Sequence, residues 1–159
     1  MNSGKGMIYS IVLKLTPTRE VTIGATMGHQ VHAAFLRTLR EADPELAAAL
    51  HAPDQPVRPF TVSPLRGVSR AREGQVRLSP GRDCWLRFTV LQTHIFERFM
   101  TRFLDPALPV PSAVEGPVPS AVEGSGVEGS RGRLVIRLGR AELLIREVLA
   151  TPGAHPWSG

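Results

Sequence analysis

The sequence predicts an α+β domain in which strands and helices follow each other in the order β-α-β-β-α-β. Three observations predict this fold. Apolar residues recur at strand or helix spacing in successive segments, and turn signals separate these segments. The chain has 159 residues, which suits one domain, and 42% of them are hydrophobic, which is enough for one packed core. We therefore expect an antiparallel sheet with two helices on one face, the ferredoxin-like arrangement.

The first expected strand spans residues 7–15 (MIYSIVLKL), which are apolar and β-branched and end at a Thr-Pro turn signal. Residues 18–24 are interpreted as a connector. A helix is expected over residues 26–42, because apolar side chains recur there at helical spacing. These side chains are Val31, Phe35, Leu36 and Leu39.

A second, short helix is expected after Asp43, which can cap it, with Pro44 at its first position. His51 then lies just past this helix, in a loop that leads to a strand at residues 59–65. Residues 75–78 are expected to pair with that strand as a hairpin, with basic residues at the tip. The tip residues are Arg66, Arg70, Arg72 and Gly74.

The clearest strand spans residues 83–92, where buried and outward positions alternate, with Trp85 and Arg87 on the outward side. Thr93 is expected to cap the helix that follows. Large apolar residues repeat at helical spacing along that helix and predict a core stripe. They are Phe96, Phe99, Met100, Phe103 and Leu104.

The composition changes abruptly at residues 109–131, which contain the motif PSAVEG twice. Proline, glycine, serine and glutamate dominate here, and such a segment cannot bury enough surface to order its backbone. We interpret it as a disordered repeat insertion in a domain that spans residues 1–151. A strand is expected at 133–138, a strand or short helix at 141–149, and a linker at 152–159.

The charge is +5, from 19 basic and 14 acidic side chains, and only Lys5 and Lys14 are lysines. The planar guanidinium group suits phosphate oxygens, so either an anionic partner or a solvated basic surface explains this composition. A single cysteine, Cys84, excludes an internal disulfide framework and a cysteine-based zinc site. No apolar run is long enough to span a membrane and no signal peptide is recognisable, so a cytoplasmic location is expected.

Histidines are the main candidates for acid–base chemistry. His51 is followed seven residues later by Arg58, and this pair fits an acid or base with an electrostatic stabiliser for phosphoryl chemistry. His29 and His32 lie in the first helix, where His32 is interpreted as either a core-boundary or a catalytic side chain. A metal site on two imidazoles alone is disfavoured. His94 is interpreted as a surface residue at a helix start.

Residues 43–65 (DPELAAALHAPDQPVRPFTVSPL) resemble the N-terminal half of the CRISPR-associated endoribonucleases of the RAMP superfamily, which cut precursor CRISPR RNA within its repeats. The segments MIYSIVLKL, GHQVHAAFLRTLREADPELAAALH, PGRDCWLRFTVL and HPWSG are similar to the same family. The resemblance covers nearly the whole chain except the PSAVEG insertion. The family normally has a second ferredoxin-like domain, and we expect this chain to be the half that precedes it.

The resemblance implies cleavage without a metal or other cofactor, in which the 2′-OH attacks the adjacent phosphate and leaves a 2′,3′-cyclic phosphate and a 5′-OH. It implies that His51 is the acid–base residue and Arg58 a stabiliser, or that His29 and His32 act instead. The tyrosine that some members place in the first helix does not carry over, because this sequence has only Phe35 and Leu36 in that region.

The implied partners are CRISPR repeat RNA, proteins of a CRISPR effector complex and a second copy of the chain, with no membrane. The expected RNA contacts are arginines, and those on strands also suit a border with a second domain. They are Arg66, Arg70, Arg72, Arg87, Arg133 and Arg137. A non-catalytic RNA-binding module and a structural subunit of an effector complex are the alternative functions.

Overall fold

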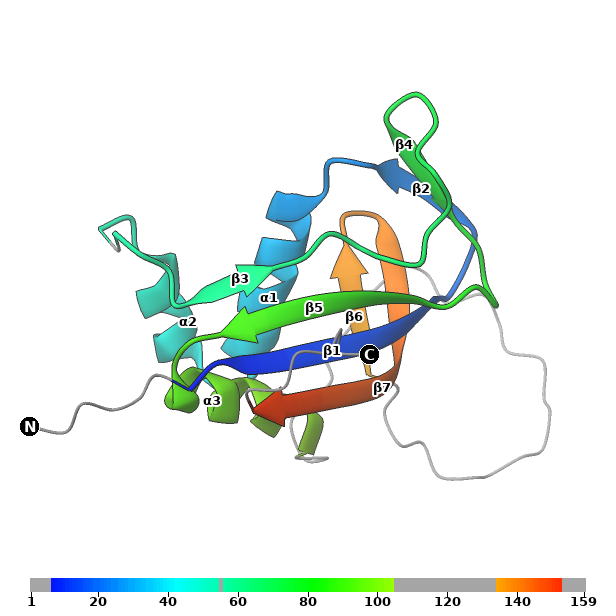
Figure 1. Cartoon of the computed structure of the whole chain (residues 1–159). Coiled ribbons are helices and arrows are strands. Elements are labelled where there is room, and N and C mark those ends of the chain that lie inside the picture. Colours follow the sequence, from blue (N-terminus) through cyan, green and yellow to red (C-terminus); the bar gives the residue numbers. More distant parts are fainter. Residues whose placement is uncertain (1–6, 55, 105–133, 153–159) are drawn as a thin grey trace, which may run out of the picture.

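A computed structural model describes residues 7–54, 56–104 and 134–152, and these residues form the expected α+β fold. A five-stranded antiparallel sheet in the order β3-β5-β1-β7-β6 lies in front of the helices, and a separate ribbon pairs β2 with β4 (Figure 1). The elements are β1 (Tyr9–Pro17), β2 (Val21–Gly24), α1 (Gly28–Ala42), α2 (Pro44–His51), β3 (Phe60–Val62), β4 (Gln75–Leu78), β5 (Cys84–Val90), α3 (Thr93–Leu104), β6 (Val135–Leu138) and β7 (Ala141–Pro152).

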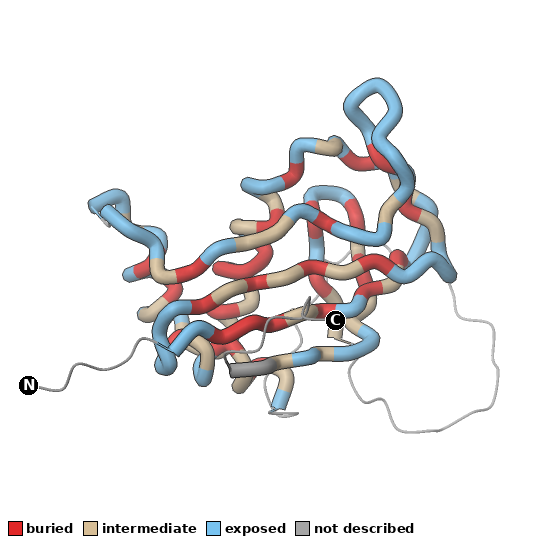
Figure 2. Tube along the Cα trace, in the orientation of Figure 1, coloured by how far each residue is buried: buried red, intermediate tan, exposed pale blue. Residues whose placement is uncertain are grey.

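Strand β1 is the centre of the sheet and pairs with β5 on one side and β7 on the other. Leu13, for example, lies opposite Leu86 of β5 and Val148 of β7. Alternate residues of β1 and β5 are buried, as their sequence pattern predicts, because successive side chains of a strand point to opposite faces (Figure 2). One face of the sheet therefore belongs to the core.

An aromatic cluster joins the helices to this face. Phe35 of α1 stacks on Phe99 of α3, with ring centroids 4.7 Å apart, and both rings contact Phe88 of β5. Phe35 also stacks on Phe60 of β3, at 4.3 Å. Because Phe35 and Phe99 meet the same strand residue, α1 and α3 cover the same face of the sheet.

The hairpin expected between residues 59–65 and 75–78 is wrong. Strand β4 pairs instead with β2, which forms inside the segment interpreted as a connector. The chain after β3 keeps following β5, where the Ser63 amide donates to the Arg87 carbonyl at 2.8 Å and Arg66 bridges to Trp85. This segment is therefore already paired along β5 and does not reach β4.

Helix α3 buries a narrower stripe than its sequence predicts. Ile95 and Phe99 are fully buried, whereas Leu104 is 75% exposed. The buried Arg102, an arginine on the inner side of the helix, forms an ion pair with Glu41 of α1. The buried positions of α3 are therefore Ile95, Phe99 and Arg102, whereas the predicted core residues Phe96, Met100 and Phe103 are only partly buried against the core.

The C-terminal part resolves the choice between strand and helix in favour of a strand, β7, which runs to Pro152. It forms a hairpin with β6 through Gly139, whose φ of +56° favours glycine. Pro152, predicted as the start of a linker, therefore belongs to the sheet. The predicted insertion at 109–131 and the rest of the predicted linker lie outside the described residues. No described helix is both long and apolar enough to cross a membrane.

Candidate active site

The side chain of His32 lies on the flank of α1 that meets β3. Its ring stacks on Phe60, with centroids 5.0 Å apart and planes at 29°, and Phe60 in turn stacks on Phe35 of the core. The imidazole is therefore half-buried at the edge of the aromatic cluster. This contact fixes the plane of the ring from one side.

The other neighbour of the His32 ring is Arg58, which lies just before β3. Its Nη1 atom lies 2.8 Å from Nε2 of His32. A guanidinium group only donates hydrogen bonds, so Nε2 of His32 must accept this one. The imidazole is therefore neutral here, with its proton on Nδ1.

The environment keeps His32 neutral. Burial lowers the pKa of His32 below its ordinary value of 6.5, and the positive charge of Arg58 and then that of His51 lower it further. A neutral imidazole at neutral pH can accept a proton, which is what a general base must do. The same charges make the site attractive for a phosphate group.

His51 reaches this site from α2. It is the exposed last residue of that helix, so its expected position in a loop beyond the helix is wrong. Helix α2 begins as predicted, with Pro44 at its first turn and the Asp43 carboxylate accepting a hydrogen bond from the Leu46 amide at 3.0 Å. Leu50 is buried, which leaves the next residue, His51, at the surface.

The structure thus brings together three of the four candidate catalytic residues. The predicted pair of His51 and Arg58 gains His32 as the hydrogen-bonded member, from a position 26 residues before Arg58. His29, the fourth candidate, is exposed one turn earlier on α1, and His94 is exposed as expected. The sequence did not predict that Phe60 stacks on His32, because its pattern identifies Phe60 only as a strand residue.

The candidate RNA-binding arginines fall into two groups. Arg70 and Arg72 line a depression beside the β2–β4 ribbon, together with Thr22 and Arg77. Arg66 and Arg87 lie along β5, with Trp85 and Ser63. Arg137 forms an ion pair with Glu142 at 3.0 Å, and Arg133 lies outside the described residues.

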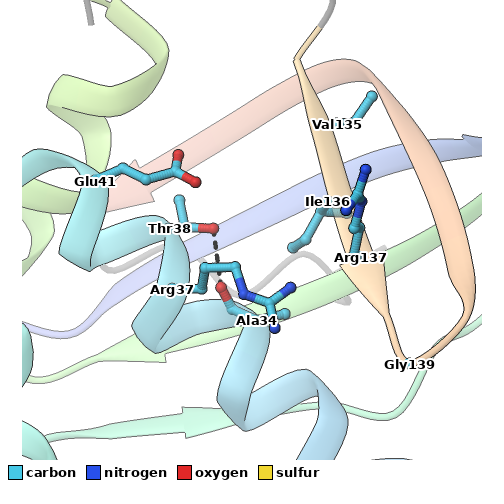
Figure 3. A pocket seen from close by; sticks show the side chains of 8 residues that line it. All are labelled: Ala34, Arg37, Thr38, Glu41, Val135, Ile136, Arg137 and Gly139. Atoms are coloured by element: carbon cyan, nitrogen blue, oxygen red, sulfur yellow. Dashed lines mark hydrogen bonds between the residues drawn. The ribbon is translucent and has the colours of Figure 1, made fainter. Parts of the chain in front are cut away.

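A further groove of about 350 Å³ separates α1 from β6 (Figure 3). Arg37 and Thr38 of α1 face Ile136 and Arg137 of β6 across it. This groove shares no lining residue with the site around His32. No group of three or more acidic, histidine or cysteine side chains in the described part of the chain is arranged to hold a metal ion.

Comparisons with known proteins agree with the fold. The family model for the CRISPR Cas6 N-terminal domain matches residues 7–111. A solved structure described as CRISPR associated protein Cas6 shares 18% identity at a TM-score of 0.53, covering 91% of this chain and 49% of that one. The product of a Cas6-related gene from Pyrococcus furiosus shares 10% identity at a TM-score of 0.59, covering 94% and 50%.

A third solved structure, described as a RAMP protein binding different RNA substrates, shares 14% identity at a TM-score of 0.56. The match covers 90% of this chain and 48% of that one. The chain therefore spans about half the length of the solved structures that it matches. No curated protein matches the sequence.

Proposed function

The chain belongs to the CRISPR Cas6 N-terminal domain family, and on that premise we propose that it is the N-terminal half of a metal-independent endoribonuclease that cuts precursor CRISPR RNA within its repeats. The family match confirms the resemblance that the sequence shows. The activity is supported by one observation above all, the hydrogen bond between Arg58 and the neutral His32 beside His51. These three side chains are the groups that RNA transesterification needs.

In the proposed reaction the 2′-oxygen attacks the adjacent phosphorus and the bond from phosphorus to the 5′-oxygen breaks. A base takes the proton from the 2′-OH, and an acid gives a proton to the departing 5′-oxygen. The products are a 2′,3′-cyclic phosphate and a 5′-OH. Because the nucleophile belongs to the substrate, RNA is cut and DNA is not.

His32 is suited to the role of the base. Its Nε2 lone pair accepts the hydrogen bond from Arg58. A phosphate that enters the site offers stronger acceptors to the guanidinium fork of Arg58, which frees Nε2 to accept the 2′-OH proton. Arg58 then stabilises the additional negative charge on phosphorus, and His51 donates the proton to the 5′-oxygen.

The fold also supports the expectation that the chain is one ferredoxin-like domain with an insertion. The six elements β1, α1, β3, β5, α3 and β7 follow the predicted order, and their strands lie as β3-β5-β1-β7 in the sheet. We assign these elements to a ferredoxin-like core, with β2, β4, α2 and β6 as additions. The family match ends at residue 111, close to the start of the PSAVEG repeats, which supports 109–131 as an insertion.

Single-turnover cleavage of a repeat RNA tests this function, with the C-terminal half supplied by fusion or in trans and with a chelator present. His51→Ala and His32→Ala should each lower the rate by about 10²–10⁴-fold with little loss of RNA affinity. Arg58→Ala should lower it by a smaller factor, because Arg58 stabilises charge and moves no proton.

His29→Ala is the matched control, since it removes an exposed imidazole from the same helix. It should cleave at the rate of the unmodified protein. A chelator-sensitive reaction would refute the metal-independent mechanism. Binding without cleavage in the complete protein would instead indicate an RNA-binding module.

A further inference from the structure

Trp85 lies on the face of the sheet opposite to the helices. It alternates along β5 with the buried Cys84 and Leu86, and its own side chain is half-buried. The helices pack on the other face, through Phe88 of the same strand. The open face, with β5 and β1 in front, is turned toward the viewer in Figure 1.

Three cations surround Trp85. Arg66 lies directly opposite it on one side, where the Arg66 amide donates to the Trp85 carbonyl at 2.8 Å and the Trp85 amide donates back at 3.0 Å. Lys14 lies opposite it on β1, with its ammonium group 2.7 Å from Glu147. Arg87 follows two residues later on the same face of β5. Cross-strand neighbours such as these have Cβ atoms about 4.5–5.5 Å apart, so their side chains meet.

The surface between these side chains is hollowed. A shallow cavity of about 260 Å³ is lined by Ser63, Arg66, Trp85 and Arg87. Arg87 contributes to this lining, and its Nε atom, which has almost no exposed surface, finds no hydrogen-bond acceptor within the described residues. The backbone of Arg87 is held by Ser63, whose hydroxyl accepts from the Arg87 amide at 2.9 Å. The exposed Arg66 and the half-buried Arg87 both line the cavity, and two guanidinium groups side by side favour an anionic ligand.

We propose that this cavity, with Trp85 as its platform, is a binding site for one nucleotide of single-stranded RNA. The indole stacks on the base, and Arg66 and Arg87 bind the adjoining phosphate. Stacking on an aromatic side chain combined with a basic track is how proteins hold unpaired bases. The inference rests on the proposed function for the identity of the ligand, and it places this nucleotide on the other face of the sheet from His32.

The immediate surroundings of Trp85 favour RNA over a protein partner. The residues that line the cavity with it are one serine and two arginines, and Thr89 and Thr61 lie next along the same face. A docking face for a protein domain is depleted of charged side chains at its centre. Here the aromatic side chain is itself the centre of a cluster of charges.

Intrinsic fluorescence tests the site without altering it. The chain has two tryptophans, so Trp157→Phe leaves Trp85 as the sole indole. Titration of this full-length variant with a short single-stranded oligoribonucleotide should quench its fluorescence as bases stack on Trp85. An abasic oligomer of equal length carries the same phosphates without bases and should bind without this quenching. An unchanged signal with the base-containing oligomer would overturn the proposal.

Affinity measurements provide the second test. Trp85→Leu should weaken binding of the oligoribonucleotide about 5- to 150-fold, which corresponds to the usual contribution of one stacked base. Arg66→Ala should reduce the slope of log affinity against log salt by about one, while Arg40→Ala, an equal loss of charge on exposed α1, should leave it unchanged.

Wild-type affinity of Trp85→Leu, as expected if this face docks a protein domain, would overturn the proposal. Neither result depends on cleavage, so the proposed endoribonuclease activity is judged separately. Conversely, quenching of Trp85 and weaker binding by Trp85→Leu would support the nucleotide site even if the complete protein did not cleave RNA.

Discussion

Replacement of Phe35 by alanine should strongly destabilise the domain and also loosen the candidate active site. Its ring is fully buried and contacts three other rings, Phe60, Phe88 and Phe99, at centroid distances of 4.3, 5.2 and 4.7 Å. Loss of a buried phenylalanine side chain costs about 3–5 kcal/mol, through lost transfer energy and the cavity that remains. This is a large part of the stability of about 5–15 kcal/mol that is usual for a domain.

Urea denaturation followed by circular dichroism measures this change in the free energy of unfolding. Phe103→Ala is the matched control, because Phe103 is only partly buried and, among the described residues, its ring contacts that of Phe99 alone. It should cost about 1 kcal/mol, the usual effect of a point mutation. Phe35→Leu keeps much of the volume and remains measurable if the alanine variant unfolds. Equal losses for Phe35→Ala and Phe103→Ala would refute the assignment of Phe35 as the centre of the core.

Three other predictions follow from particular residues. Since the pKa of His32 is lowered in the folded state, the unfolded chain binds more protons below pH 6.5. Stability should therefore fall as pH drops through that range, and less steeply in His32→Gln, as urea titrations at several pH values would show. Gly67→Ala should shift the urea midpoint more than Gly81→Ala. Both glycines have positive φ, which costs roughly 1–2 kcal/mol with a side chain, but only at Gly67 would the new Cβ lie 3.1 Å from a backbone oxygen, that of Asp83. Deletion of residues 109–131 should leave the melting temperature nearly unchanged, because a long loop adds little beyond closure entropy; a loss of folding would contradict the assignment of an insertion.

Local signals in the sequence predicted most elements of the fold. The alternation in β5 and the Asp43-Pro44 start of α2 depend on neighbouring residues, and both are confirmed. The partner of β4 could not be predicted in the same way, because either β2 or the segment after β3 could supply alternating residues. The choice is made by the backbone hydrogen bonds of Ser63 and Arg66 to β5, which no local pattern encodes.

The sequence predicted which side chains could form the candidate site, but it did not predict which of them contact each other. The spacing of His51 and Arg58 predicted that pair, whereas the hydrogen bond of Arg58 is to His32. That contact depends on how α1 packs against β3 through Phe35 and Phe60. Sequence spacing reports distances along one element and says little about contacts between two elements, and the position of Trp85 among cations was missed for the same reason.

The division of roles between the two histidines is the central claim, and a substrate with sulfur in place of the 5′-oxygen at the cut site tests it most directly. A thiolate leaves without being protonated, so this RNA needs the base and not the acid. With the C-terminal half supplied, His51→Ala should cut the sulfur-containing RNA at nearly the wild-type rate, whereas His32→Ala should stay about 10²-fold slower or more. Rescue of His32→Ala in place of His51→Ala, or of neither variant, would contradict the assignment of His32 as base and His51 as acid.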